Sequence, residues 1–272
     1  MEIWIFILIY IGVGIIGGFL AGFFGIGGGI IFVPVLITTL PYFHGATSDV
    51  LHVAIGTSLA LVFFSGASST IKQIKLHHLD FGIIKTWLLA SFVGAIAGAF
   101  VVDYLSGSLL KIIFAFFLLL VTISVVFKHP AKEEEEHAVE PVPSIWFRLP
   151  ASFFIGFSAM FFGIGGGILT SPFFSLFSYP LKKAIAIASC ASMVIGIVGV
   201  IAFIILGWSA PDLPRFSWGY FNWFSLVCLA PTTFLFAPLG VHLANKLTEK
   251  WLKWLYAGFL LIVTVYMFFQ AF

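Results

Sequence analysis

The sequence predicts an all-α polytopic membrane protein with an inverted internal repeat, in which each half is a glycine-interrupted helical hairpin plus three transmembrane helices. Of its 272 residues, 61% are hydrophobic and 9% are charged, whereas about a quarter of the residues of a soluble protein are charged. Apolar runs at residues 50–71, 109–127 and 251–272, in which Lys111 and Lys253 are the only Lys, Arg, Asp or Glu residues, are long enough to span a bilayer. One glycine-rich motif occurs in each half of the chain.

The glycine motif establishes the repeat. Residues 23–30 read Phe-Phe-Gly-Ile-Gly-Gly-Gly-Ile, and the same eight residues recur at 161–168. Over the longer windows 18–34 and 156–172, the two copies agree at 12 of 17 positions. Glycine runs favour irregular backbone, whose polar groups need partners inside a membrane. Paired interruptions in corresponding halves of a transporter indicate its binding site.

The alignment divides the chain into a first transmembrane repeat (1–127), a charged cytoplasmic linker (128–145) and a second transmembrane repeat (146–272). Four consecutive Glu in the linker are typical of a solvated loop. Each repeat is expected to begin with the glycine-interrupted element and to continue with three helices. The expected ranges are 3–40, 49–72, 80–104 and 109–127 in the first repeat, and 146–178, 183–207, 219–245 and 250–271 in the second.

Basic residues indicate how the glycine-interrupted element meets the membrane. If the element crosses once, the 13 Lys and Arg residues divide almost evenly between the two sides. If it folds back as a hairpin, eleven lie on one side and only Lys111 and Arg215 on the other. Short cytoplasmic loops collect Lys and Arg, so the hairpin is favoured, with both termini outside. The eleven residues are Lys72, Lys75, Lys85, Lys128, Lys132, Arg148, Lys182, Lys183, Lys246, Lys250 and Lys253.

Each glycine run precedes a short apolar helix and presents backbone N–H groups without intrahelical partners. Helix N-termini carry partial positive charge and bind anions, and glycine allows close backbone approach. Two such ends, converging from inverted repeats, would form a cage of donors for a small oxyanion. The residues expected in this cage are Gly27, Gly28, Gly29, Gly165, Gly166 and Gly167.

A plainer interpretation is that the glycines only allow close helix packing, as small residues do in membranes. Consecutive glycines exceed what a packing surface needs, so the binding interpretation is favoured for the two runs. Close packing is the interpretation for isolated glycines, namely Gly12, Gly14, Gly17, Gly18, Gly94 and Gly98.

Polar side chains follow each hairpin in the next helix. Thr57 and Ser58 of the first half correspond to Ser189 and Cys190 of the second. Their side chains either donate to the same anion or bond their own helix backbone at i−4, and the sequence leaves both alternatives open. The residues interpreted as packing and helix-end polarity are Ser65, Ser68, Ser69 and Thr70.

Ionisable residues inside the apolar segments are scarce. His52 could carry a coupling proton or could be an interfacial residue, and the second interpretation is favoured. The absence of an acidic residue at the expected midplane argues against a cation site. No catalytic motif, metal-ligand set or cofactor motif is present, so neither an enzyme nor a metal or cofactor is expected. A net charge of +2 gives no reason to expect nucleic acid as a partner.

The repeated motif G-F-x-A-x-x-F-G-I-G-G-G-x-x-x-x-P at 18–34 and 156–172 resembles the signature of the TauE/SafE family of sulfite exporters, also called the toluene sulfonate uptake permease family. The run Ala-Ile-Gly-Thr-Ser-Leu at 54–59 is similar to that family's next motif. The resemblance covers both halves. It implies secondary transport of small sulfur-containing anions such as sulfite, sulfoacetate and other organosulfonates.

The second half departs from the first at two places in this pattern. Ser189-Cys190 stands where the first half has Thr57-Ser58, and Thr170-Ser171 stands where it has Phe32-Val33. The hydroxyl groups around the expected anion are therefore arranged asymmetrically, and the resemblance does not imply how a substrate is oriented.

Together these features predict a secondary carrier in a prokaryotic inner membrane that works by alternating access. Its expected partners are the lipid bilayer and a small sulfur-containing anion. The alternatives are a passive anion channel, a uniporter for another small oxyanion, or a membrane component without its own substrate. The sequence leaves open which anion is carried, in which direction, whether protons drive transport, and whether a homo-oligomer forms.

Overall fold

The computed structural model describes residues 3–44, 49–102, 104–106, 142–177, 179–211 and 213–248, with scattered positions between 109 and 123 and between 251 and 269. In the described residues the regular elements are helices, and Ser217 and Asn222 form an isolated β-bridge. The helices are α1 (Ile3–Phe24), α2 (Gly29–Thr39), α3 (Pro41–His44), α4 (Val50–Lys75), α5 (Phe81–Val102), α7 (Ile145–Phe162), α8 (Gly167–Leu176), α9 (Leu181–Leu206) and α10 (Trp223–Lys246).

In the described part of the chain, six helices are long and apolar enough to cross a membrane, namely α1, α4, α5, α7, α9 and α10. The two longest, α4 and α9, have 26 residues each, about 39 Å at 1.5 Å per residue. Helix α4 is the most buried of the six and therefore forms the core. The prediction of an all-helical polytopic membrane protein is confirmed. The expected linker up to residue 141, and much of the expected helices 109–127 and 250–271, lie outside the described residues.

The chain turns back at the first glycine run. The Tyr10 hydroxyl, early in α1, lies 2.8 Å from Thr39 Oγ1 at the end of α2. The Phe6 ring lies 5.8 Å from the Tyr42 ring, which follows α2. Helix α2 therefore runs antiparallel to α1, and the two form a hairpin.

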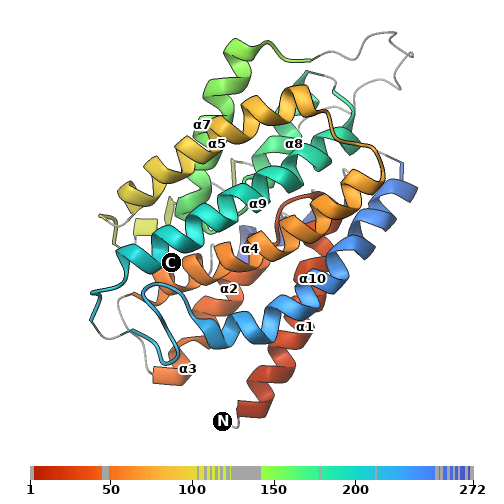
Figure 1. Cartoon of the computed structure of the whole chain (residues 1–272). Coiled ribbons are helices and arrows are strands. Elements are labelled where there is room, and N and C mark those ends of the chain that lie inside the picture. The colour runs from red at the N-terminus through yellow and green to blue at the C-terminus, as the bar shows by residue number, and fades with distance from the viewer. Residues whose placement is uncertain are drawn as a thin grey trace.

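The second glycine run makes a similar turn. The rings of Phe147, near the start of α7, and Phe177, just after α8, are 6.3 Å apart. Helix α1 rises from the N-terminus in Figure 1 whereas α7 descends from the opposite end, so the two hairpins point toward each other. The arms are unequal, because α1 has 22 residues and α2 has 11. The glycine run interrupts the apolar segment only after residue 24, which leaves the first arm at membrane-spanning length.

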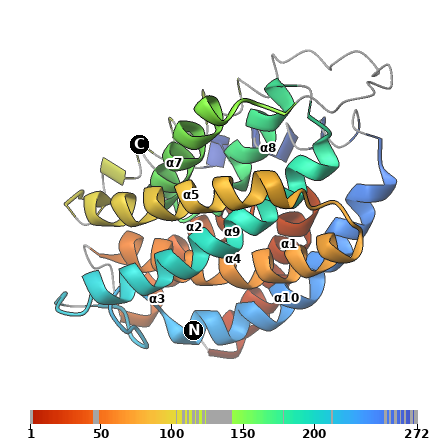
Figure 2. The same cartoon turned by 45° about the horizontal axis from the view of Figure 1, so that its top comes forward.

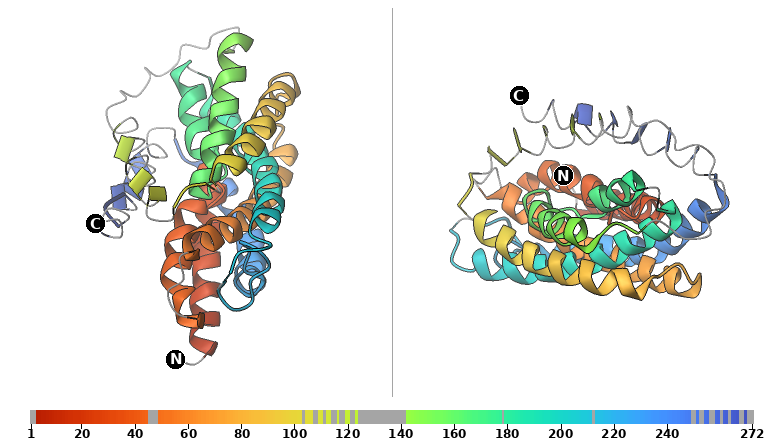
Figure 3. Two further views of the ribbon diagram at one scale, coloured as in Figure 1. Left: turned by 90° about the vertical axis from the view of Figure 1, so that its left-hand side faces the viewer. Right: turned by 90° about the horizontal axis from the view of Figure 1, so that it is seen from above.

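Four long helices form one layer of the bundle. Helices α5, α9, α4 and α10 lie side by side in this order (Figure 2). Helices α4 and α9 are antiparallel, because Gly56 contacts Phe203 while Gly66 contacts Met193. The two hairpins cover one face of this layer (Figure 3).

Packing between the hairpins and this layer is reciprocal. Helix α1 of the first half packs chiefly against α10 of the second, and α7 of the second half packs against α5 of the first. Each half therefore completes the other, and neither hairpin packs mainly against its own half.

Glycines make these contacts close. On α1, Gly14, Gly18 and Gly22 face the backbone of α10, and a Cβ on Gly22 would overlap the carbonyl of Ala237. Small residues with this spacing let membrane helices approach at backbone distance. Gly94 and Gly98 of α5 do the same against α7, as predicted. The packing prediction is wrong for Gly12, which has no neighbour within 4 Å of an added Cβ.

Basic residues gather at one end of the bundle. Lys182 Nζ, at the start of α9, donates a 3.1 Å hydrogen bond to the carbonyl of Asn245 near the end of α10. Thr70 near the end of α4 lies 3.7 Å from Cys190 Sγ of α9, so Lys72 and Lys75 lie at this end too. Arg215 belongs to the opposite end, beside the start of α10.

Replacing Gly22 by Ala is expected to destabilise the protein by about 1–3 kcal/mol, because the new methyl group overpacks the α1–α10 contact. Gly12→Ala on the same helix is the matched control, since its methyl group meets open space and alanine is the better helix former. Thermal unfolding in detergent measures both variants. Equal midpoints for the two variants would contradict this account of the contact.

Candidate functional site

The two glycine turns meet at the centre of the bundle. Residues 23–30 and 162–168 are all buried. A Cβ on Gly29 would overlap the Gly163 carbonyl, and one on Gly167 would overlap the Gly25 carbonyl. Gly27 faces the Cα of Gly165 across the same contact. Four of the six glycines that the sequence singled out therefore contact the opposite turn through the backbone, namely Gly27, Gly29, Gly165 and Gly167. Gly28 instead faces Phe32, and Gly166 faces Ile155 and Ile195.

Several turn residues adopt the left-handed conformation. Gly25, Gly27 and Gly28 have φ values of 70°, 75° and 79°, and Gly163 and Gly166 have 63° and 67°. Residues with a Cβ rarely adopt these angles. Glycine is thus required both by the backbone angles and by the closeness of the two turns.

Both short helices begin with free N–H groups. The N–H groups of Ile31 and Phe32 donate to the Gly28 carbonyl at 2.9 and 3.2 Å, and those of Leu169 and Thr170 donate to the Gly166 carbonyl at 3.2 and 3.0 Å. Helical bonding thus starts only after the glycines. Within the described part of the chain, no acceptor faces the N–H groups of these six glycines: Gly27, Gly28, Gly29, Gly165, Gly166 and Gly167. Two helix N-termini with unpaired donors therefore converge at the centre.

Serine hydroxyls donate hydrogen bonds to carbonyl groups of the same turns. Ser58 and Ser65 of α4 donate to the carbonyls of Gly163 and Gly27 at 2.7 and 2.8 Å. Ser192 of α9 donates to the Gly165 carbonyl at 2.7 Å. Buried carbonyls need such partners, and each hydroxyl places a positive hydrogen against a carbonyl that would otherwise repel an anion. The N–H groups of the six glycines remain without partners among the described residues.

Two of these serines were missed by sequence reasoning. Ser65 was interpreted as packing or helix-end polarity, but its hydroxyl binds a glycine turn. A signal for it exists, because Ser65 follows Ser58 by seven residues and so lies on the same helix face. Ser192 had no such signal, because its role depends on how α9 approaches the second turn.

The other candidate hydroxyls bond their own helices. Thr57 Oγ1 donates to the Val53 carbonyl at 2.6 Å, and Ser189 Oγ donates to the Ile185 carbonyl at 2.9 Å. A hydroxyl has one hydrogen, so neither donates to an anion in this conformation. The Cys190 side chain faces Thr70 of α4. Of the four candidates, only Ser58 reaches a glycine turn.

His52 is buried in the protein near the start of α4. The residue is 5% exposed, and its ring stacks on Tyr220 with centroids 5.0 Å apart. Nδ1 lies 3.8 Å from Asp49 Oδ1, and neither ring nitrogen has a hydrogen-bond partner among the described residues. This burial is a tertiary effect, since the Tyr220 loop covers the end of α4.

A buried polar network ties four helices together at the same end. Asn222 caps α10 by accepting from the Ser225 N–H at 2.9 Å, and its own N–H donates to Thr57 Oγ1 at 2.8 Å. The Ser225 hydroxyl lies 3.2 Å from the Tyr10 hydroxyl, which also contacts Thr39. The network joins α1, α2, α4 and α10, and no local pattern in the sequence indicates it.

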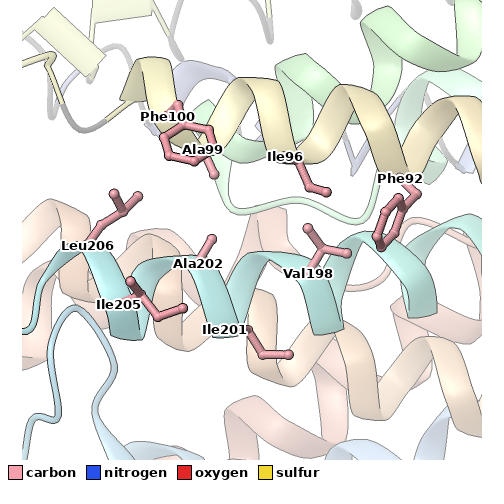
Figure 4. A pocket seen from close by; sticks show the side chains of 9 residues that line it. All are labelled: Phe92, Ile96, Ala99, Phe100, Val198, Ile201, Ala202, Ile205 and Leu206. Atoms are coloured by element: carbon pink, nitrogen blue, oxygen red, sulfur yellow. The ribbon is translucent and has the colours of Figure 1, made fainter.

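An apolar groove between α5 and α9 offers a contrasting cavity (Figure 4). Its volume is about 290 Å³. Its lining carries no polar side chain, so it has no donor for an anion. The lining residues are Phe92, Ile96, Ala99, Phe100, Val198, Ile201, Ala202, Ile205 and Leu206.

A bundle of membrane-length apolar helices that buries two donor-rich backbone turns at its centre is the architecture of a membrane transport protein. Comparison with known proteins agrees with this class. The family profile described as sulfite exporter TauE/SafE matches residues 10–267. The chain therefore belongs to the TauE/SafE sulfite exporter family.

Relatives cover nearly the whole chain. A probable membrane transporter protein of Haemophilus influenzae is 29% identical over 263 residues, which is 97% of this chain and 98% of the relative. One from Bacillus subtilis is 28% identical over 89% of this chain and 90% of its own length. One from Methanocaldococcus jannaschii is 28% identical over 94% and 92%. No solved structure matches the chain.

Replacing Ser58 or Ser192 by Ala is expected to cost about 1–3 kcal/mol of stability, because each change leaves a buried glycine carbonyl without a donor. Ser158→Ala is the control, since Ser158 bonds carbonyls of its own helix. Chemical or thermal unfolding in detergent measures the three variants. If all three behave alike, the serines do not stabilise the turns.

Proposed function

We propose that the protein is a secondary transporter that moves small sulfur-containing anions, such as sulfite, sulfoacetate or another organosulfonate, across a prokaryotic plasma membrane. The anion is bound by the N–H groups of the two glycine turns. The single observation that carries the proposal is that two helix N-termini converge at the centre with unpaired N–H groups while serines occupy their carbonyls.

The choice of substrate class follows from the donors and the family. Backbone N–H groups at helix N-termini favour oxyanions, and sulfite and sulfonate groups each present three oxygen acceptors. Among the described residues no lysine or arginine contacts the turns, so the site favours low charge over the multiple charge of larger phosphates. The family description names sulfite exporters, which supports a sulfur oxyanion.

Alternating access is the proposed mechanism. The two halves are taken to be inverted relative to each other across the membrane, which is supported by the opposite directions of α1 and α7 in Figure 1. Reciprocal packing of α1 on α10 and of α7 on α5 supports the same relation. Rocking one half against the other would expose the two turns first to one side and then to the other.

The basic end is proposed to face the cytoplasm. Lys72, Lys75, Lys182 and Lys183 gather there, whereas Arg215 lies at the opposite end, and cytoplasmic loops are enriched in such residues. Both termini would then lie outside and the linker 128–145 would lie in the cytoplasm. His52, buried at the outer end, is the proposed carrier of a coupling proton.

Replacing Gly166 by Leu is expected to abolish sulfite or sulfoacetate flux into proteoliposomes. A side chain there meets Ile155 and Ile195 and would have to adopt a left-handed backbone angle, so it displaces the turn that presents the N–H donors. Gly28→Leu tests the other turn, and Gly12→Leu is the control for a lipid-facing change. Size-exclusion profiles verify folding. Wild-type flux from a folded Gly166→Leu protein would contradict the proposed anion site. A transport rate of the wild-type protein that never saturates with anion concentration would indicate a channel.

Cysteine labelling checks the orientation. In a variant without Cys190 and Cys228, a membrane-impermeant thiol reagent added to intact cells is expected to label Arg215→Cys. It should spare Lys75→Cys and Lys183→Cys until the cells are opened. If Lys75→Cys and Lys183→Cys report opposite sides, the inverted arrangement is wrong.

A further inference from the structure

Helix α4 carries a stripe of polar side chains along one buried face, which we name the α4 stripe. Its members are Ser58, Ser65, Ser69 and Gln73, spaced by seven, four and four residues. At about 100° per residue they fall within an arc of about 80°. All four are buried, with exposures of 0%, 1%, 1% and 2%. Two of them already contact the glycine turns, so the stripe starts at the candidate site.

Ser69 is the unexplained member of the stripe. Its hydroxyl has no hydrogen-bond partner among the described residues. Two other buried helix serines bond their own backbone: Ser91 donates to the Trp87 carbonyl at 2.8 Å, and Ser189 donates to that of Ile185. A buried hydroxyl without a partner is destabilising and calls for an explanation. Folding alone gives no reason for a serine at this position.

The stripe ends among positive charges. Gln73 Oε1 lies 2.9 Å from His78 Nδ1 in the loop after α4. Burial lowers the pKa of His78, and the nearby ammonium groups of Lys182 and Lys183 lower it further. These two lysines are therefore close enough to act on the end of the stripe. The one acidic residue in this loop is Asp80. Its carboxylate accepts hydrogen bonds from the N–H groups of Gly82 and Ile83 at the start of α5.

We propose that the α4 stripe lines the route of the anion between the glycine turns and the basic end. Lys182 and Lys183 attract the anion, and Ser69 donates a hydrogen bond to it on the way. Ser69 lies four residues, about 6 Å, from both Ser65 at the first glycine turn and Gln73 near the basic end, so its hydroxyl stands between the two ends of the route. This inference rests on the proposed function for the nature of the cargo, but the route itself holds for any small anion.

Ser69→Ala separates a transport role from a structural one. Because the hydroxyl has no partner, its removal should leave the unfolding midpoint unchanged or slightly raised. Flux of sulfoacetate in proteoliposomes should fall by about tenfold, as expected for the loss of one hydrogen bond to a charged group. A stable Ser69→Ala protein with wild-type flux would contradict the role of Ser69.

Thiol labelling tests the route without relying on the cargo. In the variant lacking Cys190 and Cys228, Ser69→Cys should react with an anionic methanethiosulfonate sulfonate applied at the basic end. Ala67→Cys is the matched control, since it lies at nearly the same depth on the opposite side of α4. It should stay unreactive, because it faces away from the route.

The outcomes distinguish the two proposals. Labelling at Ser69→Cys that sulfoacetate slows supports both the route and the cargo. Labelling that no sulfur anion slows supports the route and overturns the proposed cargo. Absence of labelling at Ser69→Cys, while the unlabelled background protein still transports sulfoacetate, overturns the route and leaves the proposed function standing.

Discussion

The structure depends on one constraint, which is that backbone polar groups at the centre of a membrane protein must find partners inside the protein. Both apolar hairpins break at a glycine run, and each break releases N–H and carbonyl groups far from water. The two turns meet each other at backbone distance. Serines of α4 and α9 then bind three of the released carbonyls. The N–H groups of the six glycines remain without partners among the described residues, and anion transport would rest on these donors.

The same constraint explains the packing around the turns. Helix α4 is almost wholly buried because it supplies two of the three hydroxyls and packs against α9, α10 and α2. Glycines on α1 and α5 bring the hairpins close to the opposite halves, which keeps the turns aligned. A polar network at one end, from Thr39 through Tyr10 and Ser225 to Asn222, closes the bundle there. Among the described contacts, no comparable polar network joins the helices at the basic end.

Much of the fold followed from local patterns. Apolar length located the long helices to within a few residues, and the glycine runs located both turns. The glycine runs also indicated where two turns meet, since Gly27 and Gly29 contact the second turn; that these glycines bind an anion stays a prediction. Ser65 and Ser192 were missed, since a serine in an apolar helix looks alike whether it bonds its own backbone or another segment. The burial of His52 had no signal either, because it depends on the distant Tyr220.

The sequence alone determined that the chain is a membrane protein, where its helices run, that it repeats, and that glycines interrupt each half. These properties depend on composition and on neighbours along the chain. Only the tertiary structure decided that the two turns touch, which hydroxyls bind their carbonyls, and that Ser69 is left without a partner. Those contacts join residues more than a hundred positions apart, as Ser58 and Gly163 do, and no local pattern specifies how such segments approach each other.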